Sequence, residues 1–159
     1  MCIRDSFLIT QNIDGLHQRS GVPKDKIIEI HGNATEARCL NCGEKANILD
    51  FHAAIKTNNP LPKCSNCDGI VKVATISFGQ PMNENDMLQA SNISSHCDLM
   101  IVMGSSLSVM PAGQIPNLAI KSGAKIVILN REETIYDAMA NIVINDELKI
   151  ICKELIKLI

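Results

Sequence analysis

Short apolar runs alternate along the chain with segments in which apolar residues recur every three or four positions. This alternation is typical of an α/β fold in which helices connect the strands of a parallel sheet. The run at residues 99–103 has no polar interruption, so we expect that strand to be buried on both faces. The predicted strands are residues 7–10, 27–30, 99–103, 125–129 and 141–144, and the predicted helices are residues 48–55, 83–94, 112–122 and 148–158.

Four of the seven cysteines form two Cys-x-x-Cys pairs, Cys39 with Cys42 and Cys64 with Cys67. Residues 43–63 separate the pairs, a spacing just beyond the commonest one for a four-cysteine zinc site. Two disulfides or a redox dithiol are the alternatives, and the odd number of cysteines disfavours a disulfide framework. Four thiolates complete a tetrahedral coordination shell, so we expect the Zn²⁺ to be structural rather than catalytic.

Composition narrows the classes of partner. The formal net charge is -2 and aromatic residues make up 3%, so neither a basic surface for a phosphate backbone nor a stacking platform for bases is expected. Residues 33–76 hold five Lys or Arg and four Asp or Glu, which disfavours a DNA-binding zinc ribbon. The sequence has neither a long apolar stretch nor a secretory signal, so we expect a cytoplasmic protein without a membrane partner.

Polar residues follow the predicted strands at the point where open α/β sheets bind their ligands. Gly104-Ser105-Ser106 places small residues and free amides where a backbone can approach a phosphate, and Asn130 is positioned to bond a ribose hydroxyl. Together with the polar segment at residues 10–17, these residues predict a dinucleotide lying across the sheet. The chain nevertheless contains no Gly-x-Gly-x-x-Gly motif.

His31 differs in position from the other three histidines. It follows the apolar run at residues 27–30 and precedes Gly32, which places an imidazole where a strand meets a loop. An imidazole can take a proton from a hydroxyl near neutral pH. A catalytic base is therefore one interpretation of His31, and an ordinary structural histidine is the other.

Five motifs in this order resemble the sirtuins, the family of NAD-dependent protein-lysine deacylases. The motifs are TQNIDGLHQRSG at residues 10–21, EIHG at 29–32, the two Cys-x-x-Cys pairs, SFGQ at 77–80 and GSSLSVMPA at 104–112. The resemblance implies a Rossmann-like NAD-binding domain formed by residues 7–32 and 77–159, with an inserted zinc-binding module of residues 33–76. Residues 1–6 are expected to be a non-native leader or an artefact of sequence assembly.

The resemblance also implies roles for individual residues. His31 matches the catalytic histidine, and Asn12 and Asp14 match residues around the nicotinamide and its ribose, so these three form the expected catalytic set. The expected NAD-binding set is Gln11, Asn12, Asp14, Gly104, Ser105, Ser106 and Asn130. The expected walls of the site for the acylated-lysine peptide are Phe78, Gly79 and Val109.

The implied reaction transfers the acyl group from lysine to NAD and yields nicotinamide and O-acyl-ADP-ribose, with His31 removing a proton from a ribose hydroxyl. Two alternatives stay open: transfer of ADP-ribose to protein at the same site, and a non-catalytic zinc-bearing interaction module. Gln80 departs from the Glu common after Phe-Gly in the family. The family's Gly-rich strand-turn would precede residue 7, so we expect this chain to be the C-terminal portion of a sirtuin core, with low activity by itself.

Overall fold

A computed structural model describes residues 6–56 and 61–158, without side chains for residues 53–56. The chain divides into two compact units, Met1–Asp86 and Met87–Ile159, referred to below as the N-terminal and C-terminal units. The expected leader at residues 1–6 lies outside the described residues except for Ser6. The division into residues 7–32 with 77–159 and residues 33–76 stays a prediction.

The N-terminal unit begins with two short parallel strands. β1 (Leu8–Thr10) pairs with β2 (Ile27–Glu29) in a two-stranded sheet, and Ile30 N–H donates to the Thr10 carbonyl just beyond the last pair. The connection between the strands contains helix α1 (Leu16–Arg19) and the 3₁₀ turn η2 (Lys24–Lys26). Since parallel strands end at the same edge of a sheet, this arrangement brings together the segments that follow β1 and β2.

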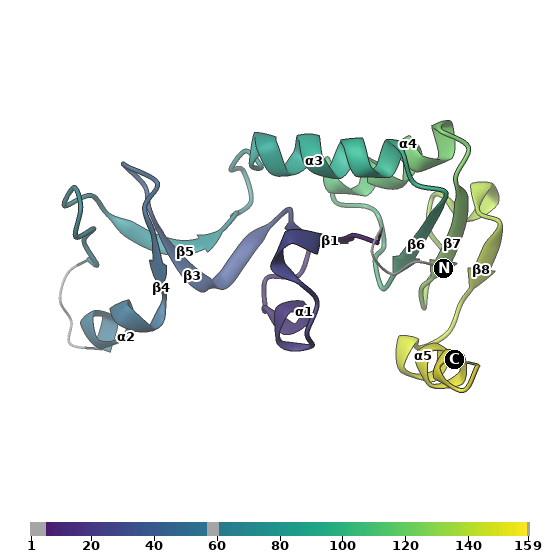
Figure 1. The fold of residues 1–159 in the computed structure, drawn as a ribbon, viewed down its shortest axis with the longest axis horizontal. Helices are drawn as coiled ribbons and strands as arrows, with labels where there is room; N and C mark the ends of the chain where they lie inside the picture. Colours follow the sequence, from purple (N-terminus) through teal and green to yellow (C-terminus); the bar gives the residue numbers. More distant parts are fainter. Residues whose placement is uncertain (1–5, 57–60, 159) are drawn as a thin grey trace. The chain divides into compact units, whose positions relative to one another are not determined.

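A three-stranded antiparallel sheet forms the rest of the N-terminal unit (Figure 1). Its order is β4-β3-β5, and its buried core consists of small apolar residues and cysteines, namely Ala37, Cys39, Cys64 and Val71. Helix α2 packs beside β4. The elements are β3 (Gly32–Cys39), β4 (Lys45–Asn47), α2 (Leu49–Lys56) and β5 (Val71–Thr75).

Gly32 allows β3 and β5 to approach each other directly after His31. Its φ is 76°, and a Cβ atom at this position would lie 2.1 Å from the Ala74 carbonyl oxygen. The nearby hydrogen bond from Ile76 N–H to the His31 carbonyl, 2.9 Å long, closes the same junction. A side chain at residue 32 must therefore push the two strands apart.

Replacing Gly32 by alanine is expected to lower the free energy of unfolding by about 3 kcal/mol or more, because backbone strain and a clash with backbone add together. Gly21 is the matched control, since its φ is 95° but no atom lies within 4 Å of its virtual Cβ. Gly21→Ala should lower stability by only about 1 kcal/mol. Urea unfolding followed by circular dichroism measures both, and equal losses would contradict the steric argument.

The C-terminal unit contains a parallel sheet in the order β6-β7-β8. The register is continuous from Leu99↔Lys125 to Met103↔Leu129, and β8 continues it on the other side of β7. This sheet confirms the predicted α/β fold with parallel strands. Helix α3 (Glu84–Ser95) begins in the last residues of the N-terminal unit. The elements that follow it are β6 (Leu99–Met103), η3 (Ala112–Gln114), α4 (Ile115–Lys121), β7 (Lys125–Leu129), η4 (Asp137–Met139), β8 (Ile142–Ile144) and α5 (Leu148–Ile156).

The prediction that β6 is buried on both faces is wrong for the described residues. Val102 is 8% exposed, whereas Ile101 and Met103 are 49% and 48% exposed. Alternate residues of a strand point to opposite faces, and Val102 points into the core. That core, which lies on the side covered by α4, contains Val102, Leu107, Ala119, Ile126, Ile128 and Tyr136.

The predicted helix over residues 148–158 is also corrected at its end. Helix α5 stops at Ile156, so Leu158 lies beyond it and is 83% exposed, while Ile151 is buried. Among the helices of the described part of the chain, none has the length and apolar character needed to cross a membrane.

Candidate functional site

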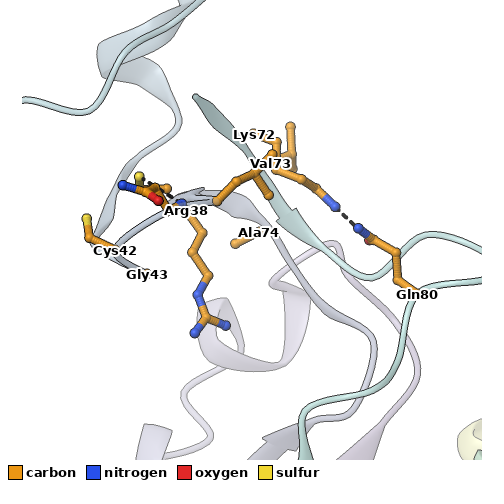
Figure 2. A pocket seen from close by; sticks show the side chains of 10 residues that line it. Arg38, Cys42, Gly43, Lys72, Val73, Ala74 and Gln80 are labelled. Carbon is orange, nitrogen blue, oxygen red and sulfur yellow. Dashed lines mark hydrogen bonds between the residues drawn. The ribbon is translucent and has the colours of Figure 1, made fainter. Parts of the chain in front are cut away.

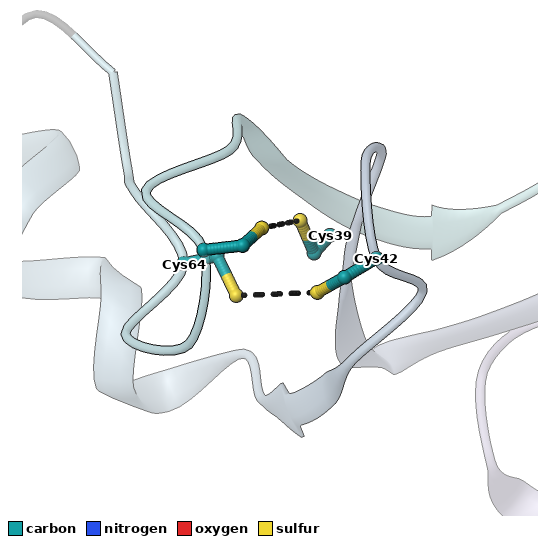
Figure 3. Close-up of side chains that lie close together, drawn as sticks. Cys39, Cys42 and Cys64 are labelled. Carbon is teal, nitrogen blue, oxygen red and sulfur yellow. Dashed lines mark hydrogen bonds between the residues drawn. The ribbon is translucent and has the colours of Figure 1, made fainter.

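The four predicted metal ligands lie together in the N-terminal unit. Their Sγ atoms are all within 4.8 Å of one another, and the closest approaches are 3.6 Å, from Cys39 to Cys67 and from Cys42 to Cys64 (Figure 3). Cys39 is the last residue of β3 and Cys42 lies in the turn before β4, while Cys64 and Cys67 lie in the turn before β5. The predicted grouping of the four cysteines is confirmed.

The two Cys-x-x-Cys turns have the same backbone geometry. In the first, Gly43 N–H donates to the Cys39 carbonyl at 3.1 Å, and in the second, Asp68 N–H donates to the Cys64 carbonyl at 2.9 Å. Gly43 and Asp68 occupy equivalent positions, and both have left-handed φ values, 76° and 58°. Asp tolerates this conformation better than most residues other than Gly. Both turns therefore direct their sulfur atoms toward one point.

The sulfur cluster fits a zinc ion in geometry and in charge. A tetrahedral site with Zn–S bonds of about 2.3 Å requires sulfur atoms about 3.8 Å apart, close to the contacts in this cluster. The backbone N–H of Cys42 holds the pKa of Cys39 at about 6, so one thiolate forms readily. The backbone N–H of Glu44 lowers the pKa of Cys42, but the neighbouring thiols outweigh it and raise that pKa to about 11. A bound dication removes this mutual repulsion.

Gly69 is the residue that leaves room for the sulfur atoms. A Cβ at this position would lie 2.9 Å from Cys39 Sγ and 3.1 Å from Cys67 Sγ. Replacing Gly69 by alanine is therefore expected to weaken zinc binding by about tenfold or more, since a shift of a few tenths of an ångström displaces two ligands. Ser65→Ala is the control, because Ser65 is an exposed residue inside the second pair. Zinc release to a competing chromophoric chelator measures both variants, and equal affinities would contradict the prediction.

His31 and Gln11 meet at the ends of the parallel strands β1 and β2. His31 Nδ1 lies 3.2 Å from the Gln11 carbonyl oxygen. A carbonyl oxygen can only accept, so Nδ1 carries a proton, and in the neutral imidazole Nε2 therefore has the lone pair. The half-buried imidazole is thus held in the tautomer that a general base requires.

The loop after β1 carries the predicted residues Asn12 and Asp14, both exposed. Asn12 N–H donates to Thr10 Oγ1 at 3.1 Å, and Asp14 Oδ1 accepts the Leu16 N–H at 2.9 Å. The carboxylate of Asp14 therefore accepts the first N–H of helix α1, and this hydrogen bond holds the carboxylate in place. Exposed carboxylate and amide groups fit a ligand rich in hydroxyl and amide groups.

Sequence reasoning missed the polar network behind His31. Asn33 is buried, its Nδ2 donates to Glu29 Oε1 at 2.7 Å, and its Oδ1 accepts both the N–H and the hydroxyl of Thr35. The network spans β2 and β3 and fixes the turn that presents His31. The signal in the sequence is the pair of polar residues Glu29 and Asn33 on either side of Ile30-His31-Gly32, which had no assigned partner.

The second group of predicted residues lies in the C-terminal unit, after β6. Gly104 has a φ of 60°, and its N–H donates to the Leu129 carbonyl at 2.9 Å. Ser105 Oγ accepts the Leu107 N–H at 3.3 Å, and the exposed Ser106 hydroxyl lies 2.7 Å from the Ser108 hydroxyl. These serines therefore present hydroxyl groups at the carboxyl edge of the sheet.

A strained residue fixes the loop after Ser106. Leu107 is buried and has a φ of 56°, an uncommon conformation for a large side chain. A Cβ on Gly113 would lie 2.2 Å from the Leu107 carbonyl oxygen, so glycine is required there. Burial of Leu107 in the core and the close contact with Gly113 hold the strained turn in place, as is common at functional sites.

Asn130 follows β7 at the same edge and is buried. Its Nδ2 donates to the Glu132 carbonyl at 2.7 Å, and its own carbonyl accepts from Asn145 Nδ2 at 3.2 Å. The side-chain amide of Asn130 thus stabilises the loop that follows β7. Asn145, which follows β8, is a further polar residue at this edge that sequence reasoning missed.

The predicted substrate residues occupy two loops. Phe78 is 100% exposed, and Gly79 has a φ of 83° in the turn closed by the hydrogen bond from Gln80 N–H to the Ser77 carbonyl. Val109, in the C-terminal unit, is 42% exposed. In the N-terminal unit, the structure thus brings His31 together with Gln11. In the C-terminal unit, it groups Gly104, Ser105 and Asn130 at one edge of the parallel sheet.

Comparison with known proteins adds independent information. A model described as the Sir2 family matches residues 3–111. An NAD-dependent protein deacetylase of Rhodopseudomonas palustris is 45% identical over 141 residues, which cover 89% of this chain and 56% of the relative. NAD-dependent protein deacetylase 1 of Bradyrhizobium diazoefficiens is 48% identical over 141 residues, which cover 89% of this chain and 55% of the relative. The chain thus spans little more than half the length of these relatives.

Solved structures match the chain over nearly its whole length. One described as "Sir2-p53 peptide-NAD+" has a TM-score of 0.86 and 35% identity, and the match covers 96% of this chain and 62% of that chain. Another, described as "Sir2 bound to acetylated peptide", has a TM-score of 0.88 and 34% identity, with 96% and 63% covered.

Proposed function

Since the chain belongs to the Sir2 family, we propose that the whole protein is an NAD-dependent protein-lysine deacylase. The observation that carries the proposal is the hydrogen bond from His31 Nδ1 to the Gln11 carbonyl at the ends of β1 and β2. That bond leaves Nε2 of the neutral imidazole as a proton acceptor. The names of the relatives, NAD-dependent protein deacetylases, support the same reaction.

His31 acts in this proposal as the general base. Its Nε2 removes a proton from a ribose hydroxyl, which makes that oxygen a nucleophile toward the acyl carbon. The Gln11 carbonyl keeps the imidazole in the required tautomer, and the Asn33 network holds the turn that carries it. The imidazolium then returns the proton as the free lysine leaves.

NAD would supply the ADP-ribose group that accepts the acyl group: the acyl oxygen would take the place of the departing nicotinamide on the ribose, and water would complete the transfer, so that free lysine, nicotinamide and O-acyl-ADP-ribose are the products. In the N-terminal unit, Gln11, Asn12 and Asp14 are proposed to contact the nicotinamide and its ribose. The carboxylate of Asp14 would stabilise the positive charge that develops on the sugar. In the C-terminal unit, the proposed contacts to the rest of the dinucleotide are Gly104, Ser105, Ser106 and Asn130.

The substrate in this proposal is a protein or peptide with an acylated lysine. Phe78, Gly79 and Val109 are proposed to hold the peptide and the acyl-lysine side chain. The titles "Sir2 bound to acetylated peptide" and "Structure of Sir2Tm bound to a propionylated peptide" name such peptides for the matching structures. A cytoplasmic location fits the proposal, because four zinc-binding thiols stay reduced there.

The test is the product balance of the whole protein with NAD and an acetyl-lysine peptide. We expect one nicotinamide and one O-acetyl-ADP-ribose for each acetyl group removed. Mass spectrometry of peptide and protein distinguishes this outcome from ADP-ribosyl transfer, which would leave ADP-ribose attached to an amino acid with the acetyl group intact. Nicotinamide release without loss of acetyl groups would contradict the proposal.

A further inference from the structure

Three basic residues form a row across the antiparallel sheet of the N-terminal unit. Arg38 on β3 is the direct partner of Lys45 on β4 and of Lys72 on β5. Directly opposite residues on neighbouring strands point to the same face. This face is the one away from Ala37 and Cys39, which are buried in the core. Like charges in direct opposition destabilise a strand pair, so the row calls for a compensating partner.

Acidic residues of the chain compensate this row only in part. Lys45 forms an ion pair with Glu36 at 3.1 Å. Burial raises the pKa of Asp86, and the charges of Lys45 and Arg38 oppose that shift, so this carboxylate partly offsets the charge of these two members of the row. Lys72 instead donates to neutral oxygens. Within residues 6–56 and 61–158, neither Arg38 nor Lys72 has an ion pair within 4.0 Å.

A cavity of about 470 Å³ opens beside these two residues (Figure 2). Arg38 and Lys72 line it from neighbouring strands, and Asn41 and Gln80 add amide groups. Cys39 and Cys42 of the sulfur cluster also line it, and the lining contains no aspartate, glutamate or aromatic residue. The volume lies within the range of ligand pockets, about 300–1,000 Å³, and exceeds what a single ion needs. An anionic side chain together with its flanking backbone fits both the charge and the size.

Gln80 connects this cavity to the turn assigned to the substrate peptide. Its Oε1 accepts from Lys72 Nζ at 2.8 Å and from Ser77 N–H at 2.9 Å. The turn from Ser77 to Gln80 contains Phe78 and Gly79, two of the residues proposed above to hold the peptide. A peptide lying along this turn therefore passes the mouth of the cavity. A nucleic acid is disfavoured, because the lining has no aromatic residue and the chain has a net charge of -2.

We propose that the cavity binds a glutamate or aspartate side chain of the substrate, close to the acylated lysine, through the ammonium group of Lys72. Gln80 orients the Lys72 ammonium group, while the guanidinium of Arg38 lies beside Gly43 and adds positive charge to the lining. The cavity thereby selects substrates by sequence. This inference rests on the proposed function.

The test measures binding of four fluorescent peptides to the whole protein: acetyl-lysine or unmodified lysine, each with Glu or with Gln at the flanking positions. Fluorescence anisotropy should show the Glu peptide binding about fivefold to tenfold more tightly than the Gln peptide when the lysine is acetylated. Lys72→Gln and Gln80→Glu should bind the Glu and Gln peptides with about equal affinity. Gln80→Glu keeps both cations but fills their acceptor position with a carboxylate. Lys24→Gln, at an exposed lysine of the same unit, should keep the preference.

The outcomes separate the two proposals. Binding that depends on acetylation but not on Glu would overturn the inference and leave the proposed function standing. Binding that depends on Glu but not on acetylation would contradict the proposed function, and with it the inference as stated. An oligonucleotide that binds more tightly than the Glu peptide and loses affinity in Lys72→Gln would assign the cavity to nucleic acid and overturn the inference.

Discussion

Replacing Cys64 by serine is expected to abolish stoichiometric zinc binding and to unfold the sheet formed by β3, β4 and β5. Structural zinc contributes roughly 10–16 kcal/mol of apparent binding free energy in small zinc modules. Whole domains are stable by only about 5–15 kcal/mol. The core of this sheet is small, and two of its four buried residues, Cys39 and Cys64, are themselves zinc ligands. Without the metal, little remains to hold the strands together.

Hydrogen exchange and native mass spectrometry measure this effect together. Amides of β3 and β5 should lose protection in Cys64→Ser and after treatment with a strong chelator. Amides of β6 and β7 should keep theirs, because their core contains no zinc ligand. Cys152→Ser changes a half-buried thiol outside the cluster and is expected to leave the zinc content unchanged. Retained protection of β3 and β5 in zinc-free protein would show that the metal is dispensable for the fold.

Replacing His31 by alanine is expected to lower the rate of deacylation by the whole protein by about a hundredfold to ten-thousandfold. This range is typical for the loss of a general base. NAD affinity should change only a few-fold, since the imidazole is proposed to act on a proton rather than to anchor the dinucleotide. His31→Asn should be equally slow, because an amide can donate a hydrogen bond but cannot accept the proton.

His96 provides the matched control for His31. Its Nδ1 also lies within hydrogen-bonding distance of a backbone carbonyl, that of Asn92 at 2.8 Å, but it is exposed at the end of α3. His96→Ala should therefore keep the full rate. Nicotinamide release and NAD binding by calorimetry are the two measurements. An unchanged rate in His31→Ala would remove His31 from the reaction and with it the proposed mechanism.

Apolar periodicity predicted the elements of the C-terminal unit well. Strands β6 and β7 begin and end at the predicted residues, and helix α3 is shifted by one residue from its predicted range. The two strands are predicted correctly because their buried residues, Val102, Ile126 and Ile128, are large and β-branched, whereas the buried residues of α3 are Ala90 and Ser94. The same pattern gave a wrong prediction for the burial of β6, because a continuous apolar run does not reveal which face of the strand is covered by other elements.

The antiparallel sheet of β3, β4 and β5 in the N-terminal unit was not predicted from periodicity. The inward residues of β3 and β5 are Ala37, Cys39 and Val71, and small residues and thiols give almost no hydrophobic signal. Metal coordination supplies the stability that apolar volume provides elsewhere. The row of Arg38, Lys45 and Lys72 was invisible for another reason: its members are far apart in the sequence and meet only through strand register.

The glycines show most clearly what the local sequence reveals and what only the tertiary packing reveals. In the first cysteine turn the left-handed φ belongs to a glycine, Gly43, but in the second turn it belongs to Asp68. Gly69 instead leaves space for two sulfur atoms. A left-handed conformation follows from local sequence, whereas a close approach depends on which distant atoms pack against the residue.

By itself, the sequence determined the α/β class, the four zinc ligands and the order of the motifs, because periodicity and spacing are local properties of the chain. Tertiary structure alone decided which tautomer His31 adopts, which glycines admit no side chain and which charges face one another. Each of these depends on a distance between residues remote in the chain, and such distances are set by strand pairing and packing rather than by spacing along the sequence.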